Sequence, residues 1–210
     1  MLAQPDASTR PGHRDLFLMT LLYDTGMRVG EVLSSVPGDV RTVRGSATIT
    51  VRGKGRKVRV VPLMDETVDH LQSYMRRFHD GAPPGTPLFY VLRHGSYGPM
   101  SDDNVSRIVA KHAKAARESC PSVPERVTPH MYRHSRALAL YRSGVPLPLI
   151  SEWLGHADLS TTLIYAYADT EMEREAIQAA MDQGHPLRNI VLGDAPELDD
   201  DAMRRLYGLL

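Results

Sequence analysis

The first residues that could do chemistry are polar side chains at the start of a predicted helix. Thr128 and Pro129 indicate where this helix begins, because threonine favours the N-cap and proline the first turn. His130 and Arg133 follow three residues apart, so they share one helix face. A helix N-terminus attracts anions, and this pair could therefore hold a phosphate.

A metal site is the alternative for the same helix. His130 and His134 lie four residues apart, a spacing at which two imidazoles can bind one metal ion. The zinc-protease pattern needs a glutamate directly after the first histidine, and Met131 stands there instead. No cysteine lies nearby to complete a ligand set, so we expect no metal at this helix.

Two further polar groups have weaker local support. Arg28 lies at the start of a short predicted helix, and Glu31 comes three residues later, so the two can pair on one face. Lys54 lies between two glycines, which let the backbone approach a ligand closely. Taken alone, an ordinary surface ion pair explains the first pattern better, and an exposed turn explains the second equally well.

The last polar cluster lies in residues 154–167. Gly155 ends one predicted helix and His156 lies in the connection to the next. Tyr165 comes near the end of that second helix. Tyr167 is two residues on and is a rival nucleophile, although positions two apart on a helix face different directions.

Hydrophobic periodicity predicts a mainly α-helical fold with a small antiparallel β-sheet, an α+β class. Residues 47–51 and 58–61 are rich in β-branched side chains and flank a glycine-containing turn, which predicts a β-hairpin with a basic tip. Loops are expected at 83–85 and 95–99. Helices are expected at 13–23, 27–34, 66–79, 101–118, 128–143, 147–154, 160–168 and 170–183.

The formal net charge is zero, but the charges are unevenly distributed. Residues 40–62 contain seven Lys or Arg and no Asp or Glu, whereas residues 169–210 contain ten acids and four bases. Residues 1–168 therefore hold 21 bases against 15 acids, a net charge of +6. A basic face can attract nucleic-acid phosphates while an acidic tail balances the total, although two solvated surfaces of opposite sign would give the same counts.

The composition also narrows the class of protein. A chain of 210 residues can bury a substantial core, and it contains no run of eighteen apolar residues that would predict a membrane span. The N-terminus lacks the pattern of a secretory signal. Cys120 is the single cysteine and cannot form an internal disulfide, which fits a cytoplasmic protein.

In their order along the chain, these features resemble the tyrosine recombinase (phage integrase) family. The family carries an arginine in T-G-x-R-x-x-E, matched by residues 25–31, and a lysine in a G-K-G hairpin that ends in V-P-L, matched by 53–63. It also carries H-x-x-R, matched by 130–133, and L-G-H with a tyrosine nine residues after the histidine, matched by 154–165. The resemblance covers roughly residues 1–180. Each motif alone is weak, but their joint order is specific.

The resemblance implies the fold of a tyrosine recombinase catalytic domain and a reaction that cuts and rejoins double-stranded DNA. Tyr165 would attack the scissile phosphate and form a 3′-phosphotyrosine, while Arg28 and Arg133 would bind the non-bridging oxygens. Glu31 would orient the site. The arginines supply positive charge and the covalent bond conserves the phosphodiester energy, so no metal and no cofactor are expected.

The remaining roles implied by the resemblance concern proton transfer and DNA contact. Lys54 would protonate the leaving 5′-oxygen, and His130 would assist proton transfer at the tyrosine. His156 would hydrogen-bond the phosphate. The basic residues of the hairpin are expected to contact the DNA backbone: Arg56, Lys57 and Arg59.

The resemblance also implies a domain plan and an assembly. We expect a catalytic domain at residues 1–183 and a tail at 184–210 with a short amphipathic helix, in which Met203, Leu206, Tyr207 and Leu210 have helical spacing. Family members usually carry an N-terminal DNA-binding domain, for which this chain offers no counterpart. Related recombinases assemble on DNA as tetramers, so we expect a homotetramer there.

Two alternatives keep DNA as the partner. A type IB topoisomerase has similar residues and relaxes supercoils as a monomer, but the spacing from L-G-H to the tyrosine favours the recombinase. A catalytically idle DNA-binding fragment could regulate a full-length integrase, but the intact set of six site residues favours an active enzyme.

Overall fold

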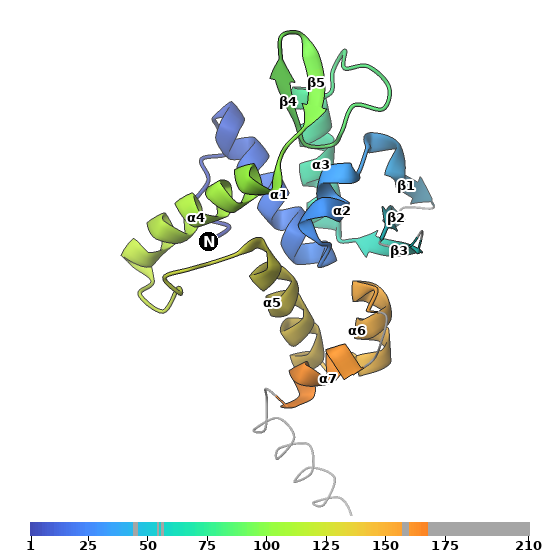
Figure 1. Ribbon diagram of the computed structural model, residues 1–210, viewed down its shortest axis with the longest axis vertical. Helices are drawn as coiled ribbons and strands as arrows, with labels where there is room; N and C mark the ends of the chain where they lie inside the picture. The colour runs from blue at the N-terminus through green and yellow to red at the C-terminus, as the bar shows by residue number, and fades with distance from the viewer. Residues whose placement is uncertain (44–45, 54, 56, 157–159, 168–210) are drawn as a thin grey trace, which may run out of the picture. The chain divides into compact units, whose positions relative to one another are not determined.

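The computed structural model describes residues 1–43, 46–53, 55, 57–156 and 160–167, which belong to one structural unit, Met1–Ala168 (Figure 1). Several expectations lie outside these residues. They are the placement of Lys54 and of Arg56, the helix at 170–183, the boundary at 183/184 and the amphipathic helix of the tail.

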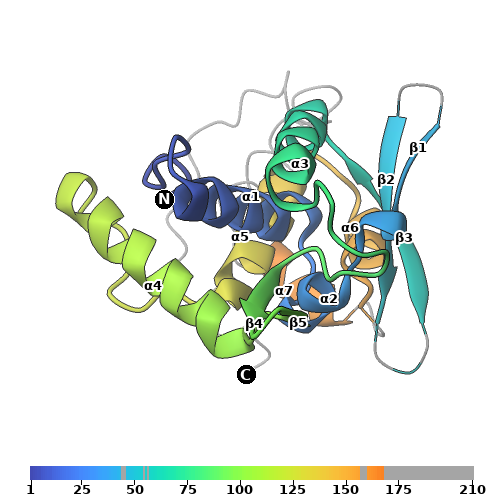
Figure 2. The same ribbon diagram turned by 90° about the horizontal axis from the view of Figure 1, so that it is seen from above.

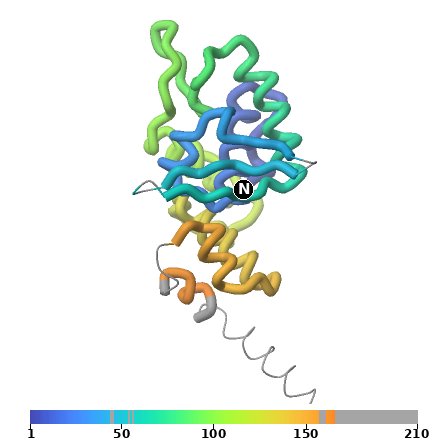
Figure 3. The backbone as a smooth tube through the Cα atoms, turned by 90° about the vertical axis from the view of Figure 1, so that its right-hand side faces the viewer, coloured from blue at the N-terminus to red at the C-terminus, as the bar shows by residue number. Residues whose placement is uncertain are grey.

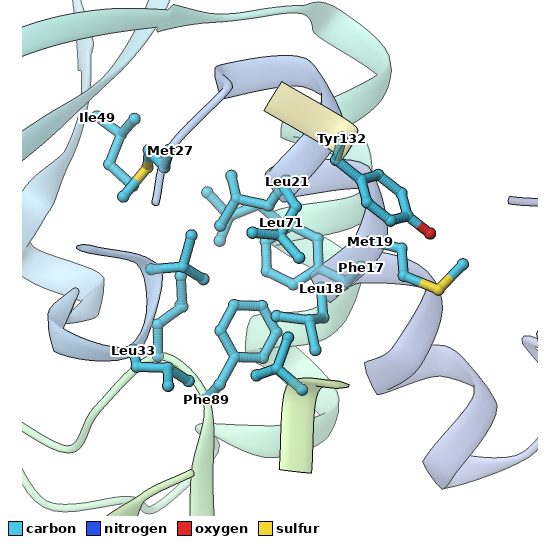
Figure 4. Close-up of a cluster of buried hydrophobic side chains, with 14 of the residues drawn as sticks. Phe17, Leu18, Met19, Leu21, Met27, Leu33, Ile49, Leu71, Phe89 and Tyr132 are labelled. Atoms are coloured by element: carbon cyan, nitrogen blue, oxygen red, sulfur yellow. The ribbon is translucent and has the colours of Figure 1, made fainter. Parts of the chain in front are cut away.

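The central helix, α1 (Arg10–Thr25), owes its limits to local signals. The Thr9 hydroxyl accepts a hydrogen bond from the Gly12 amide at 3.1 Å, and a proline stands in the first turn. The helix ends at Gly26, which has a left-handed φ of +61°. Along its buried face Phe17, Leu18 and other apolar side chains form the centre of the larger hydrophobic core (Figure 4).

The described residues form seven further helical segments. They are α2 (Val29–Ser34), a 3-10 turn (Pro37–Asp39), α3 (Asp65–Phe78), α4 (Asp102–Ser119), α5 (Pro129–Arg142), α6 (Leu147–Leu154) and α7 (Ser160–Tyr167). Helix α1 packs against α3 and α5, while α5, α6 and α7 contact one another. In both ribbon views α4 lies on one side of α1 and the three-stranded sheet lies on the other (Figure 2).

The three-stranded sheet is antiparallel, with the strand order β1-β2-β3 (Figure 3). Its strands are β1 (Val40–Val43), β2 (Ser46–Arg52) and β3 (Val58–Leu63). Ile49 in β2 lies opposite Val40 and Val61, and it is fully buried. In β3 the side chains of Val61 and Leu63 are buried while their neighbours are exposed, so alternate residues of this strand face the core.

A second, two-stranded sheet corrects one expectation. Residues 95–99 were expected to form a loop, but β4 (Tyr90–Arg93) and β5 (Ser96–Pro99) pair as an antiparallel hairpin. The turn residues His94 and Gly95 both have positive φ, +47° and +78°, as a tight two-residue hairpin turn requires. Strand β5 contains a glycine and a proline, which are both depleted in strands, so residue propensities do not predict it.

The predicted fold class is confirmed: the described part is mainly helical, with small antiparallel sheets. Within that part, no helix has both the length and the apolar character needed to cross a membrane.

Candidate active site

A cleft of about 700 Å³ opens where the start of α2, the β2–β3 turn and the end of α6 meet. The side chains that line it include four cationic groups and a single carboxylate. Such an excess of positive charge in a concave site favours a polyanionic ligand. The lining residues are Arg28, Gly30, Glu31, Arg52, Gly53, Lys57, Val58, Arg59, Gly155 and His156.

The carboxylate of this cleft is held by two arginines. Arg59 binds Glu31 through both guanidinium ends, at 3.0 Å and 2.8 Å, and Arg28 contacts the same carboxylate at 3.2 Å. Burial raises the pKa of Glu31, but the hydrogen bonds from Arg59 and from the Arg28 amide outweigh it and leave the pKa below its ordinary value. Glu31 is therefore ionised at neutral pH, and the Arg28 side chain remains 47% exposed to the cleft.

Arg59 differs from the expectation that it contacts the DNA backbone from an exposed hairpin tip. Its side chain is 13% exposed, and its Nε donates to the Trp153 carbonyl at 3.1 Å, so it joins β3 to α6. The reason is the alternation of β3, which places Arg59 on the same face as Val61 and Leu63. That period-two pattern was visible in the sequence and could have identified Arg59 as an inward-facing residue.

Gly155 allows this approach of Arg59 to the end of α6. It has a left-handed φ of +67°, and a Cβ at this position would lie 2.9 Å from the Arg59 guanidinium. Any other residue type would be strained by the left-handed backbone, and its Cβ would crowd Arg59.

Arg133 is buried in the structure, with 2% of its surface exposed. Its guanidinium donates to the Gly26 carbonyl at 2.6 Å and to the Leu154 carbonyl at 2.7 Å, which are the C-terminal ends of α1 and α6. Burial and the charges of Arg28 and Arg59 lower its pKa to about 10, so it stays charged at neutral pH. Backbone carbonyls thus hold in place a positive charge that acts on the residues of the cleft.

Two histidines lie close to these charges. His156 lines the cleft, and its Nδ1 lies 2.7 Å from the hydroxyl of Thr162, a buried residue of α7. Burial, together with the charges of Arg133 and Arg28, lowers the pKa of His156 to about 4. Exposed His130, in the first turn of α5, has its pKa lowered by partial burial and by His134, Arg133 and Arg28. Both imidazoles are therefore neutral at pH 7.

Tyr165 is 5% exposed and packs with Ala137, Ile150 and Leu154 in a second apolar cluster. Its hydroxyl lies 2.9 Å from Nδ1 of His134, a residue that the sequence singled out only for the alternative of a metal site. Burial raises the pKa of Tyr165, while the charge of Arg133 acts in the opposite direction.

The structure thus brings together five of the six candidate side chains, and the sixth, Lys54, lies outside the described residues. Arg28 and His156 line the cleft, and the charge of Arg133 acts on the pKa values of His130, His156 and Tyr165. Across the described ranges, no three His, Cys, Asp or Glu side chains group in a way that could hold a metal ion.

The sequence profile of the phage integrase family matches residues 2–172. The chain belongs to the phage integrase family. Among curated relatives, tyrosine recombinase XerD of Staphylococcus haemolyticus (strain JCSC1435) is 31% identical over 188 residues, 89% of this chain and 59% of that protein. XerD of Staphylococcus epidermidis (strain ATCC 12228 / FDA PCI 1200) is 32% identical over the same shares. The chain therefore spans less than two thirds of the length of these relatives.

Solved structures of the family have the same fold. A crystal structure of XerH site-specific recombinase bound to palindromic difH substrate, a post-cleavage complex, matches with a TM-score of 0.70 and 28% identity, over 84% of this chain and 48% of that one. A crystal structure of XerA recombinase matches with a TM-score of 0.64 and 29% identity, over 86% and 60%. The predicted fold, that of a tyrosine recombinase catalytic domain, is confirmed.

Proposed function

We propose that this chain is the catalytic domain of a site-specific recombinase that cuts and rejoins double-stranded DNA through a 3′-phosphotyrosine at Tyr165. The observation that carries the proposal is the positive cleft in which Arg28 and His156 lie next to the buried charge of Arg133, with Tyr165 within reach of that charge. Membership of the phage integrase family supports the same reaction.

The proposed chemistry follows from the state of each group. Exposed Arg28 binds a phosphate oxygen, and Arg133 adds a fixed positive charge that stabilises the negative charge of the transition state. With the Thr162 hydroxyl donating to Nδ1, neutral His156 carries its proton on Nε2 and donates it to the phosphate. His130 lies in the same phosphate-binding group, and Lys54 is the proposed acid that protonates the leaving 5′-oxygen.

A suicide substrate tests the proposed function. In a DNA duplex with a nick a few nucleotides downstream of the cleavage site, the short fragment that carries the released 5′-hydroxyl diffuses away. The covalent protein–DNA adduct then accumulates and is visible as a slow band on a denaturing gel. Wild-type protein should form this adduct and Tyr165→Phe should not, because only the first has a nucleophilic oxygen there. Tyr167→Phe is the matched control and should form it normally. An adduct that survives in Tyr165→Phe and disappears in Tyr167→Phe would reassign the nucleophile.

The proposed partners are double-stranded DNA and further copies of this chain. The XerH structure contains a palindromic substrate, and a two-fold symmetric site is suited to two copies of one protein. We propose a homotetramer on DNA, formed when two such sites are joined. Light scattering on the DNA complex should give the mass of four chains with two duplexes; a complex that never exceeds two chains on one duplex would contradict the tetramer. A DNA substrate and the single thiol Cys120, free and exposed, fit a cytoplasmic location.

A further inference from the structure

Helices α5 and α7 meet at a contact between two titratable side chains. The Tyr165 hydroxyl lies 2.9 Å from His134 Nδ1, a hydrogen-bond distance between groups 31 residues apart in the chain. The phenol is 5% exposed, so it depends on the protein for its hydrogen-bond partner. When Nδ1 carries no proton, the phenol donates and the imidazole accepts.

The His134 ring is itself oriented by a neighbour. His130 lies one helical turn earlier on α5, and the two rings meet edge to face, with centroids 4.6 Å apart and planes at 88°. His130 is exposed, whereas His134 is partly buried against Tyr165. A nucleophile, an acceptor within hydrogen-bond reach and a third group that orients the acceptor form the arrangement by which proteins activate hydroxyl nucleophiles.

Tyr165 needs such an acceptor. A phenol of ordinary pKa, near 10, is ionised in roughly one molecule in a thousand at pH 7, and burial raises the pKa of Tyr165 further. The charge of Arg133 favours the phenolate but cannot remove the proton, because a guanidinium has no lone pair available to accept it. Among the residues that the structure describes, the titratable groups around His134 are His130 and Arg133 on α5, Tyr165 on α7 and His156 after α6.

We propose that His134, and not His130, accepts the proton of Tyr165 when the phenol attacks the DNA phosphate. This step rests on the proposed function. The Tyr165 O–H bond breaks and its proton passes to His134 Nδ1 while the new O–P bond forms. The P–O5′ bond then breaks, and its electron pair leaves on the 5′-oxygen, which takes a proton from the acid assigned to Lys54. Rejoining reverses each transfer, and His130 remains free to face the phosphate.

The pH dependence of adduct formation separates the two histidines. With the suicide substrate, His134→Ala should be slower than wild type at pH 7 by about 10²- to 10⁴-fold. Its rate should then rise about tenfold per pH unit, because the phenol must ionise by itself. His130→Ala should lose rate without acquiring that slope. A tenfold slope in His130→Ala and none in His134→Ala would overturn the proposal.

A second substitution separates proton acceptance from positioning. In His134→Asn an amide oxygen can lie near the former Nδ1 and accept the phenol's hydrogen bond, but it cannot hold the proton. We expect His134→Asn to be as slow as His134→Ala; a rate near that of wild type would show that His134 only positions the tyrosine. His94→Asn, in the exposed turn between β4 and β5, is the matched control and should react normally. Thermal unfolding of each variant checks that the fold is kept.

The leaving group gives an independent test. In a substrate with sulfur in place of the bridging 5′-oxygen, the leaving sulfur needs no proton. This substrate should therefore restore cleavage by Lys54→Ala but not by His134→Ala. Rescue of both variants would overturn the proposal.

The contact itself can be measured without DNA. In protein labelled with ¹⁵N-histidine, Tyr165→Phe should shift the His134 Nδ1 resonance, and an unchanged resonance would refute the contact. If wild-type protein forms no adduct, the proposed function fails, while this spectrum still decides whether His134 binds the phenol.

Discussion

Arg59 and Glu31 form an ion pair in the lining of the cleft. Both side chains are largely buried, at 13% and 7% exposed, and their paired hydrogen bonds satisfy the carboxylate. Because the pair neutralises Glu31, the exposed Arg28 keeps donors that can bind a ligand. Removing one partner leaves the other as a buried charge without a partner, and this lowers the stability of the fold.

Removing Arg59 should therefore destabilise the protein strongly. We expect Arg59→Ala to lower the free energy of unfolding by about 3 kcal/mol, because Arg28 is then the one charged partner of Glu31 among the described residues. Arg107→Ala is the control: Arg107 is exposed and donates to the uncharged side chain of Asn104, so its loss leaves no buried charge unpaired and should cost about 0.5 kcal/mol or less. Urea unfolding followed by circular dichroism measures both, and equal losses would show that Glu31 does not need Arg59.

The depressed pKa of His156 predicts acid sensitivity at the site. Its pKa is about 4 in the folded chain and about 6.5 when unfolded, so the unfolded chain binds the proton more readily. The stability that this neutral histidine supplies is complete above pH 6.5 and falls as the pH drops toward 4. His156→Asn cannot titrate, and it should lose about 1 kcal/mol less than wild type between pH 7 and pH 5. Urea unfolding at the two pH values tests this; parallel losses would contradict the shift.

At the scale of elements, the site depends on where helices end. Arg133 is held by the carbonyls at the ends of α1 and α6, and Arg59 passes directly over the glycine that ends α6. A helix end offers carbonyls without intrahelical partners, which is why two of them can bind one guanidinium. Substitutions that alter the end of α6 should therefore change the positions of Arg133 and Arg59 at the cleft.

Two glycines with similar backbone conformations allow the cost of backbone strain to be measured apart from the cost of a steric contact. Gly155 and Gly144 both have positive φ, +67° and +80°, but a Cβ added at Gly155 would meet Arg59, whereas one added at Gly144 would have no neighbour within 4 Å. We expect Gly144→Ala to cost about 1 kcal/mol from backbone strain alone. Gly155→Ala should cost at least twice as much and should also weaken DNA binding, because Arg59 must move. Urea unfolding and a fluorescence-anisotropy titration measure the two effects, and identical results for both variants would refute the contact.

For the whole molecule, the basic face is expected to dominate affinity for DNA. Each phosphate neutralised by a cation releases counterions, so log K falls with log[salt] by roughly 0.9 per contact. Lys57 lines the cleft and is exposed, whereas Arg76 is an exposed residue of α3 that does not line the cleft.

Lys57→Ala should reduce the slope of that salt dependence by about one. Arg76→Ala should leave the slope unchanged. Fluorescence anisotropy with a labelled duplex over a range of salt concentrations measures both slopes, and a larger change for Arg76→Ala would place DNA on another face.

The sequence alone determined the features that depend on neighbours along the chain. The helices, the β2–β3 hairpin and the pairing of Arg28 with Glu31 follow from spacings of two, three and four residues. Residues at these spacings share one face of a strand or of a helix. Family membership follows from the order of short motifs, and neither inference requires knowing how distant segments meet.

Only the tertiary structure decided which distant groups touch. Tyr165 meets His134 rather than His130, Arg59 joins Glu31 and the Trp153 carbonyl across separations of 28 and 94 residues, and Arg133 is buried between two helix ends. These contacts depend on how α5, α6, α7 and β3 pack, and packing is set by the shapes of many side chains together. Local periodicity places a residue on a face, but it does not specify what that face will meet.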